Sequence, residues 1–440
     1  MSKKILILTA SPVRDVLIDN MIKEELERLG HKVWVCPCLR EGRDAVLKYK
    51  PDIVVVPPIR NPYSRDFVEV CKSWGCGVIS RHTEPSCDWA DFKKGDERMK
   101  SEILGRWRYN IDKELVWGDD EVQILDRRKS GFPAISMGAI GLDVYFNKDL
   151  RKTLTDKDDF FTKYKLDPTK KTVLIASPWG FADSAPDLSI DEIVDAQKDM
   201  EGQGKHLAMI EQVSNSLKDK WNILVTTHPG VAQGPYVGIT KKLGIPLDSE
   251  SPMMKLVLHC DALIHAGSTA AVSAHILNIP SFQYGDVNSK VGTSWWGTPD
   301  SSISKVSPYY TDPQLLVDDI LKSKRISNAN KKTIKSLEAG RYGKMDGKGY
   351  IRAAKEISEV EGKFQFAWPI PHNDYDQLNV FKNQEKATQE GHCGICKAKF
   401  YILNTQYMKE LCAFVEGKKE KLSMLNQTFC PNCAARFIKK

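Results

Sequence analysis

The sequence predicts an α/β protein made of two Rossmann-like domains that face a cleft, followed by a small zinc-binding module. Short, continuous apolar runs alternate with amphipathic segments, which is typical of parallel sheets covered by helices on both faces. A charged segment at 147–171 interrupts this alternation, which then starts again. Two Cys-x-x-Cys pairs follow in the C-terminal region. These observations predict two sheets and a separate metal-binding segment.

The first alternation predicts a domain at 1–148. Each apolar run is short enough for a strand, and each amphipathic run has the apolar spacing of a helix. Strands are expected at 4–8, 32–36, 52–56, 77–80, 114–117 and 134–137. Helices are expected at 14–29, 44–49, 64–74 and directly after Gly118.

The second alternation predicts a domain at 149–362. Its strands are expected at 172–177, 222–226, 262–265 and in a run that ends at 284, with helices at 204–218, 236–243, 252–259 and after Thr269. Polar helices at 313–321 and within 331–360 close this half, and the latter are expected to pack back across the domain interface. A linker rich in Asp, Asn and Pro is expected at 363–389, and the zinc-ribbon-like module at 390–440.

The most informative stretch is the unit from Asp261 to Gly285, which predicts a strand, a glycine turn, a helix and a second strand. Gly267 supplies a permissive turn, and Ser268 or Thr269 is expected to cap the helix. Unpaired backbone N–H groups at the helix start would then face outward and suit a diphosphate. The alternative is an ordinary crossover without a ligand, because Gly-Ser-Thr turns are common.

Composition places few limits on function. The chain has 440 residues, of which 41% are hydrophobic and 28% charged, as in ordinary globular proteins. No apolar run approaches the roughly 18 residues of a membrane span, and the first residues lack the features of a signal peptide. A cytoplasmic protein is therefore expected, or one in a host cytoplasm if a phage encodes it.

Positive charge is concentrated at one end of the chain. The net charge is +7, and residues 391–440 hold nine Lys and Arg against three Glu, a surplus of six. An anionic partner would therefore be expected to bind the C-terminal module.

Reactive side chains follow the predicted strands of the first domain, where ligands bind in open α/β sheets. They are Arg14 and Asp15 after the first strand, Arg60 and Arg65 after the third, and Arg81, His82 and Glu84 after the fourth. The corresponding residues of the second domain are Trp179, Asp183, His228, His265, Gly267, Ser268, Thr269 and Asp286. The alternative for each set is a structural role without a ligand, because charged side chains in loops are often solvated and aromatic ones often pack locally.

With two such halves and the sequence Ile264-His-Ala-Gly-Ser-Thr269 in the second, the chain resembles glycosyltransferases of the GT-B type. Within that group it is similar to surface-carbohydrate biosynthesis proteins and, more distantly, to CDP-glycerol glycerophosphotransferases and hexosamine 2-epimerases. The motifs are Thr227-His-Pro-Gly230 and the Gly267 turn with Gly285. One position departs from the family. Where such proteins commonly carry a ribose-binding Glu, this chain has Ser273 and Ala274.

The resemblance implies that the second domain binds the diphosphate of a nucleotide sugar and that the first supplies the acceptor site and the base. Glycosyl transfer needs stabilisation of the leaving diphosphate and deprotonation of the acceptor hydroxyl. The helix start at Ser268 with His228 would meet the first need without a catalytic metal. His82 paired with Glu84 would meet the second, with Asp15 as the substitute. Arg14, Arg60, Arg65 and Arg81 are the candidates for holding the acceptor.

The C-terminal module has the strongest single signal. Cys393-Gly-Ile-Cys396 and Cys430-Pro-Asn-Cys433 are two knuckles separated by 33 residues. Four thiolates complete a closed tetrahedral Zn²⁺ site. Basic and aromatic residues interleave around them, which favours nucleic-acid binding, although a stability or oligomerisation role is an equal alternative.

Three functions follow. The favoured one is a glycosyltransferase whose acceptor is a hydroxymethylated base in DNA, by analogy with bacteriophage DNA glucosyltransferases that share the GT-B architecture. The second is a surface-polysaccharide or glycerophosphate transferase. The third is a non-enzymatic nucleotide-binding or nucleic-acid-binding protein. The oligomeric state and the donor sugar are left open.

Overall fold

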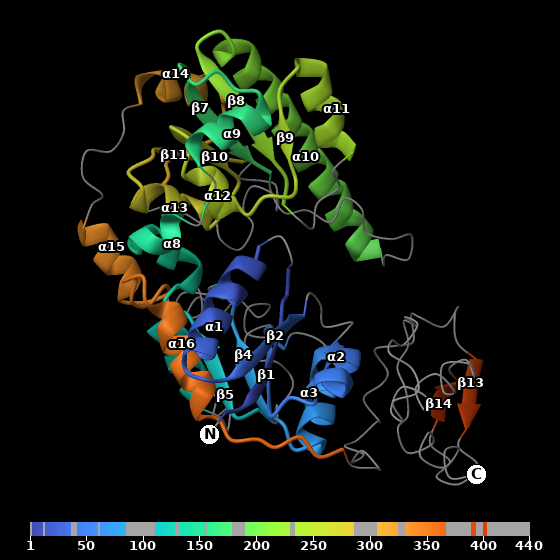
Figure 1. Ribbon diagram of the computed structural model, residues 1–440. Helices are drawn as coiled ribbons and strands as arrows, with labels where there is room; N and C mark the ends of the chain where they lie inside the picture. The colour runs from blue at the N-terminus through green and yellow to red at the C-terminus, as the bar shows by residue number, and fades with distance from the viewer. Residues whose placement is uncertain are drawn as a thin grey trace.

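The computed structural model describes residues 2–11, 14–36, 42–59, 62–84, 111–127, 133–152, 154, 156–177, 190–228, 234–285, 306–323, 331–366, 389–392 and 399–402. Two α/β domains make up most of this part of the chain (Figure 1). Every strand in their sheets runs parallel to its neighbours. The prediction of two parallel-sheet α/β domains is therefore confirmed.

The first sheet has the strand order β2-β1-β3-β4-β5-β6. Its strands are β1 (Lys4–Leu8), β2 (Lys32–Cys36), β3 (Ile53–Val56), β4 (Gly77–Arg81), β5 (Lys113–Val116) and β6 (Ala134–Ser136). The apolar residues of β1, β3 and β4 are almost fully buried, because the sheet is covered on both faces.

Helices α1 (Val16–Arg28) and α16 (Gly349–Glu359) contribute to the core on one face of this sheet, and α2 (Gly42–Tyr49) and α3 (Pro62–Ser73) contribute to the core on the other. Helix α6 (Asp119–Arg127) follows β5. Figure 1 shows α16, from near the end of the described chain, beside α1 from its beginning. The return of this C-terminal helix across the interface agrees with the sequence prediction.

The second sheet has the order β12-β11-β10-β7-β8-β9. Its strands are β7 (Lys171–Ala176), β8 (Trp221–Thr226), β9 (Leu247–Asp248), β10 (Ala262–His265), β11 (Ser281–Tyr284) and β12 (Tyr309–Tyr310). The two-residue strands β9 and β12 were not predicted, because so short a segment has no measurable periodicity. Helices α10 (Ile190–Leu217), α11 (Gly234–Leu243) and α14 (Pro313–Lys322) pack on one face, and α9 (Lys157–Tyr164), α12 (Met253–Val257) and α13 (Ala270–Ile276) on the other.

The charged connection contains more structure than predicted. It holds α8 (Lys148–Lys152) and α9, preceded by α7 (Asp143–Phe146). Helix α9 forms because Phe160, Phe161 and Tyr164 are buried against the second sheet and because Asp156 caps it by accepting the Asp158 N–H at 2.8 Å. These three aromatic residues within a charged segment could have predicted a buried helix here, but the segment was interpreted as a connection.

An apolar cluster joins the two domains. It includes Trp117 and Leu142 from the first domain, Ala271 and Val272 of α13, and Leu337 of α15 (Lys331–Glu338). The Tyr145 hydroxyl also donates to the Met254 carbonyl oxygen at 3.3 Å. Helix α13 therefore packs against the first domain as well as its own sheet.

Beyond α16, residues 363–366 run along the first domain. The Lys363 N–H donates to the Gly75 carbonyl oxygen at 2.9 Å, and the rings of Phe364 and Phe366 pack on Trp74. Strands β13 (Gln389–His392) and β14 (Lys399–Ile402) pair antiparallel. Within the described ranges, no helix combines the length and the apolar character needed to span a membrane.

Helix α10 leads to the first testable prediction. Gly204 lies inside this helix, and a Cβ atom added there would meet nothing within 4 Å. Glycine costs about 1 kcal/mol relative to alanine within a helix. Gly204→Ala is therefore expected to raise the free energy of unfolding by about that amount in urea denaturation.

Gly118→Ala is the matched control for that substitution. A Cβ atom at this position would lie 1.9 Å from the Gly340 carbonyl oxygen, so this variant should be destabilised. A Gly204→Ala variant that is less stable than the native protein would contradict the helix assignment there.

Candidate functional site

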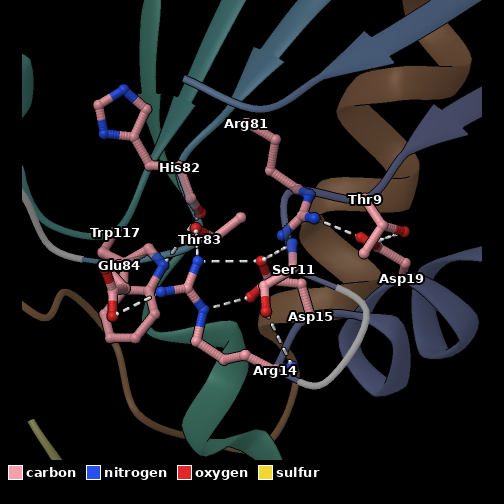
Figure 2. A network of polar contacts seen from close by, with 10 residues as sticks. All are labelled: Thr9, Ser11, Arg14, Asp15, Asp19, Arg81, His82, Thr83, Glu84 and Trp117. Carbon is pink, nitrogen blue, oxygen red and sulfur yellow. Dashed lines mark hydrogen bonds and ion pairs between the residues drawn. The ribbon is translucent and has the colours of Figure 1, made fainter. Parts of the chain in front are cut away.

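The strand orders locate the site. In the first sheet the connections reverse between β1 and β3, and in the second they reverse between β7 and β10. Ligands of open α/β sheets bind beyond the carboxyl ends of the strands at such a reversal. Several of the predicted site residues follow β1, β4, β8 and β10, and the structure gathers those of the first domain into one network (Figure 2).

Arg14 is the centre of that network. Its guanidinium donates to the Asp15 carboxylate at 2.7 and 3.0 Å and to the Thr83 hydroxyl at 2.9 Å, and it forms an ion pair with Glu84 at 2.8 Å. Burial opposes the charge, but Glu84 and Asp15 together raise the pKa of Arg14. The carboxylates of Asp15 and Glu84 therefore already engage the guanidinium that was predicted to hold an acceptor.

Asp15 and Arg81 lie deeper than expected. Asp15 is fully buried and accepts the Ser11 N–H at 3.1 Å in addition to Arg14. Arg81 is 1% exposed, and its guanidinium binds the buried Asp19 of α1. Thr9 donates to the same Asp19 carboxylate at 2.7 Å. Asp15 was predicted as a substitute base and Arg81 as a residue that holds the acceptor. Their burial and their ion pairs do not fit these two roles.

His82 is not paired with Glu84. Its Nε2 lies 2.7 Å from Glu114 Oε1, and its Nδ1 lies 3.0 Å from Glu121 Oε1. The ring is buried, which opposes its charge, yet the two carboxylates raise its pKa to about 9. His82 is thus protonated at neutral pH, which does not suit the predicted role of a general base.

This pKa leads to a prediction about stability. A folded-state pKa above the usual 6.5 adds stability that is fully present below pH 6.5 and is lost as the pH rises through about 9. Between pH 7 and pH 9.5 the free energy of unfolding is expected to fall by about 2 kcal/mol from this group. Urea denaturation across this range should show the fall in the native protein and its absence in His82→Gln. An equal fall in both would show that other groups cause it.

The glycine turn of the second domain forms as predicted, with Gly267 at φ +82°. Its backbone donors are nevertheless used internally. His265 Nδ1 accepts the N–H groups of Gly267 at 3.1 Å and Ser268 at 3.2 Å, and its Nε2 lies 2.9 Å from Ser307 Oγ. Burial lowers the pKa of His265 to about 3, so the ring is neutral. Nδ1 accepts and Nε2 donates, and His265 builds the turn from inside.

The start of α13 also differs from expectation. The Ser268 hydroxyl accepts the Ala270 N–H at 3.2 Å, and the Thr269 side chain makes no cap hydrogen bond. The prediction that several unpaired N–H groups face outward here is therefore wrong. Ser273, which with Ala274 stands where a ribose-binding Glu was expected, is 7% exposed and acts to lower the pKa of Tyr145 of the first domain, which burial raises. This position serves the domain interface.

His228 is a second-domain residue whose pKa responds to charges of the first domain. It follows β8, and its backbone N–H donates to Ser177 Oγ at 2.8 Å. Burial and the nearby Arg14 lower the pKa of His228, while Glu84 acts in the opposite direction. The pKa of this histidine of the second domain therefore depends on charges of the first domain as well as on burial.

The remaining predicted residues cannot be placed. Trp179, Asp183, Asp286 and Arg60 lie outside the described residues, as do the four predicted zinc ligands Cys393, Cys396, Cys430 and Cys433. Arg65 lies in α3, but its side chain is not described. Within the part of the chain that the structure describes, no group of three or more His, Cys, Asp or Glu residues could hold a metal ion.

The sequence reading missed the buried carboxylates Asp19, Glu114 and Glu121. A signal was present for two of them. Glu114 interrupts an apolar strand, and Asp19 stands next to the buried Ile18 on the apolar side of α1. A charge at a position that the pattern assigns to the core indicates a buried partner.

Comparison with known proteins completes this description. No protein-family model and no curated protein sequence matches the chain. Among solved structures, the wall teichoic acid polymerase TagF, soaked with CDPG, is similar with a TM-score of 0.51 and 16% identity over 81% of this chain and 88% of that one. The UDP-GlcNAc 2-epimerase of Methanocaldococcus jannaschii, in complex with UDP-GlcNAc and UDP, is similar with a TM-score of 0.50 and 13% identity over 81% of this chain and 99% of that one. At these identities the likeness shows the fold, and the two domains have a GT-B-like architecture.

Proposed function

We propose that the protein is an enzyme that binds a nucleotide-diphosphate sugar between its two domains and transfers the sugar to an acceptor hydroxyl. The observation that carries this proposal is the placement of His228 after β8 and of Glu84 after β4, at the carboxyl ends of two parallel sheets, with Glu84 held by Arg14. A proton-transfer group of one domain and a fixed carboxylate of the other thus both follow strands at the end of the sheet where this kind of fold binds ligands.

His228 is the proposed proton acceptor. Its lowered pKa leaves the imidazole neutral at neutral pH, so it can take the proton of an attacking hydroxyl. Glu84, fixed by Arg14, then stabilises the imidazolium that forms. As the new glycosidic bond forms, the bond from the sugar to the diphosphate breaks, and the nucleoside diphosphate leaves with the electron pair.

The diphosphate is proposed to lie against the Gly267 turn. The Ser268 and Thr269 side chains are partly exposed there, and their hydroxyl groups can donate to phosphate oxygens. His265 and Gly267 act by shaping the turn. Trp179, Asp183 and Asp286 are retained as proposed donor contacts from their positions after strands in the sequence.

A second candidate is transfer of glycerophosphate, because one of the two similar structures is a teichoic acid polymerase that was soaked with CDPG. A panel of UDP-, GDP- and CDP-sugars together with CDP-glycerol separates the possibilities. Release of a nucleoside diphosphate supports sugar transfer, and release of CMP supports glycerophosphate transfer. Appearance of an epimeric sugar with the nucleotide still attached supports epimerisation. Binding of the nucleotides without any turnover would overturn the enzymatic proposal.

For the acceptor we propose a hydroxymethylated base in DNA, which is supported by the basic residues of 391–440. Those residues are almost entirely outside the described ranges. The test offers the full chain DNA with and without hydroxymethylated bases, beside neutral glycans and polyols. Sugar incorporated only into the glycans or polyols would reject DNA.

We also propose that Cys393, Cys396, Cys430 and Cys433 hold one structural Zn²⁺. Two knuckles of thiolates fit the tetrahedral preference of this ion and need no other ligand. Metal analysis of the full chain tests this proposal, and a chain purified without zinc yet fully folded would reject it.

A further inference from the structure

Four consecutive residues at the end of β4 are each fixed by side-chain contacts within the first domain. The pairs are Arg81 with Asp19 of α1, His82 with Glu114 of β5 and Glu121 of α6, Thr83 with Arg14, and Glu84 with Arg14. Figure 2 shows this segment passing from the sheet toward Arg14. Glu84, the last of the four, is also the one whose charge raises the pKa of His228 in the second domain.

With Glu114 and Glu121 ionised, the contacts of His82 require a charged ring. Both of its ring nitrogens lie within hydrogen-bond distance of a carboxylate oxygen, at 2.7 Å for Glu114 and 3.0 Å for Glu121. A carboxylate only accepts, so both ring nitrogens must donate, and only an imidazolium has two N–H groups. One positive and two negative charges give this buried group of three side chains a net charge of about −1.

The backbone of His82 is fixed as well. Its N–H donates to the Leu115 carbonyl oxygen at 2.8 Å, and its carbonyl oxygen accepts the Trp117 Nε1–H at 3.1 Å. The two glutamates are themselves held, because Ser80 donates to Glu114 at 3.3 Å and the Trp117 N–H donates to Glu121 at 3.3 Å. The carboxyl end of β4 is thus bound to β5 and to the start of α6 through both side chain and backbone.

We infer that His82 is a positioning residue, which Glu114 and Glu121 hold as an imidazolium so that the end of β4 presents Glu84 to Arg14 and to the second domain. The inference rests on the proposed function insofar as Glu84 acts on His228 there. The side chain of His82 contacts Glu114 and Glu121 of the first domain. Its effect reaches the site through Thr83, the one residue between His82 and Glu84.

The groups that face His82 limit the interpretation of a pH experiment. Glu114 comes from β5 and Glu121 from α6, and these are the two charges that act on the ring. On its own segment, Arg81 binds Asp19, and Glu84 binds Arg14. Removing the charge of Glu121 while keeping its shape therefore changes the protonation of His82 with little change in packing.

The experiment compares the native full chain with Glu121→Gln. The first readout is the titration of His82 by ¹⁵N NMR of the imidazole, assigned with His82→Gln. We expect a doubly protonated ring at pH 7 in the native protein and a midpoint that is lower by roughly one unit or more in Glu121→Gln. The second readout is amide hydrogen exchange at His82, Thr83 and Glu84. After correction for the intrinsic pH dependence, exchange should accelerate about tenfold above each protein's own midpoint.

The third readout is the pH profile of nucleotide release. In Glu121→Gln, the pH at which kcat falls on the alkaline side should be lower by the same interval as the His82 midpoint. KM should be nearly unchanged. Glu25→Gln is the control. It removes an ion pair with Arg28 at the C-terminal end of α1, and all three readouts should stay at their native values.

Each failure has its own meaning. A neutral His82 at pH 7, or exchange that does not follow its titration, overturns the positioning role whether or not a donor is found. A shifted midpoint with an unmoved kcat profile overturns it as well. If no nucleotide donor is turned over at any pH, the proposed function fails, and the NMR and exchange results still decide the positioning role.

Discussion

Glu84→Gln is expected to lower the turnover of a nucleotide-sugar donor by about 10² to 10⁴-fold with a smaller change in donor affinity. The amide keeps the shape of the side chain but cannot stabilise a positive charge on His228. Arg14 retains its bidentate contact with Asp15 and its contact with Thr83, so the local structure should persist. Equal urea midpoints for the variant and the native protein would confirm that stability is not the cause.

A double-mutant cycle with His228→Gln sharpens this test. If Glu84 acts through the imidazolium of His228, the double variant should be about as slow as His228→Gln alone. Multiplied losses would show that the two residues act independently. Glu361→Gln, at an exposed carboxylate that pairs with Lys3, is the matched control and should keep native turnover. A Glu84→Gln variant within threefold of native turnover would remove Glu84 from the mechanism.

The strands and their parallel arrangement could be predicted because the local sequence carries that information. Runs such as Ile5–Leu8 and Ile53–Val56 are apolar on both faces, which indicates a sheet covered on two sides. The same logic brought Arg14, His82 and Glu84 together, since the carboxyl ends of parallel strands share one edge. The candidate site residues of the first domain were thus chosen from their positions directly after predicted strands.

The pairing of charges within that edge could not be predicted. His82 and Glu84 are close in sequence, whereas the partners of His82 come from β5 and α6, more than thirty residues later in the chain. Which carboxylate reaches which ring nitrogen depends on side-chain directions that the alternation of strands and helices does not determine. The His265 ring that fills the Gly267 turn was missed for the same reason.

The second large effect is expected from Arg81→Met, which should lower the free energy of unfolding by about 3–5 kcal/mol. Arg81 is 1% exposed and Asp19 fully buried, so the substitution leaves a carboxylate in the core without its cation. The Thr9 hydroxyl, at 2.7 Å, is then the remaining side-chain donor to Asp19. A single neutral hydrogen bond does not offset the loss of hydration of a full charge.

The pH dependence identifies the uncompensated charge as the cause. Burial already raises the pKa of Asp19 to about 6 even though Arg81 lowers it, and removing Arg81 should raise it further. A folded-state pKa above the unfolded value adds stability as the pH falls, so Arg81→Met should be less destabilised at pH 5 than at pH 8. Adding Asp19→Asn keeps an acceptor for Thr9 and removes the charge, and it should recover most of the loss at pH 8. Urea denaturation of both variants at the two pH values makes the comparison. A loss in Arg81→Met that is independent of pH and not recovered by Asp19→Asn would show that the lost packing of the arginine side chain, and not the charge of Asp19, sets the cost.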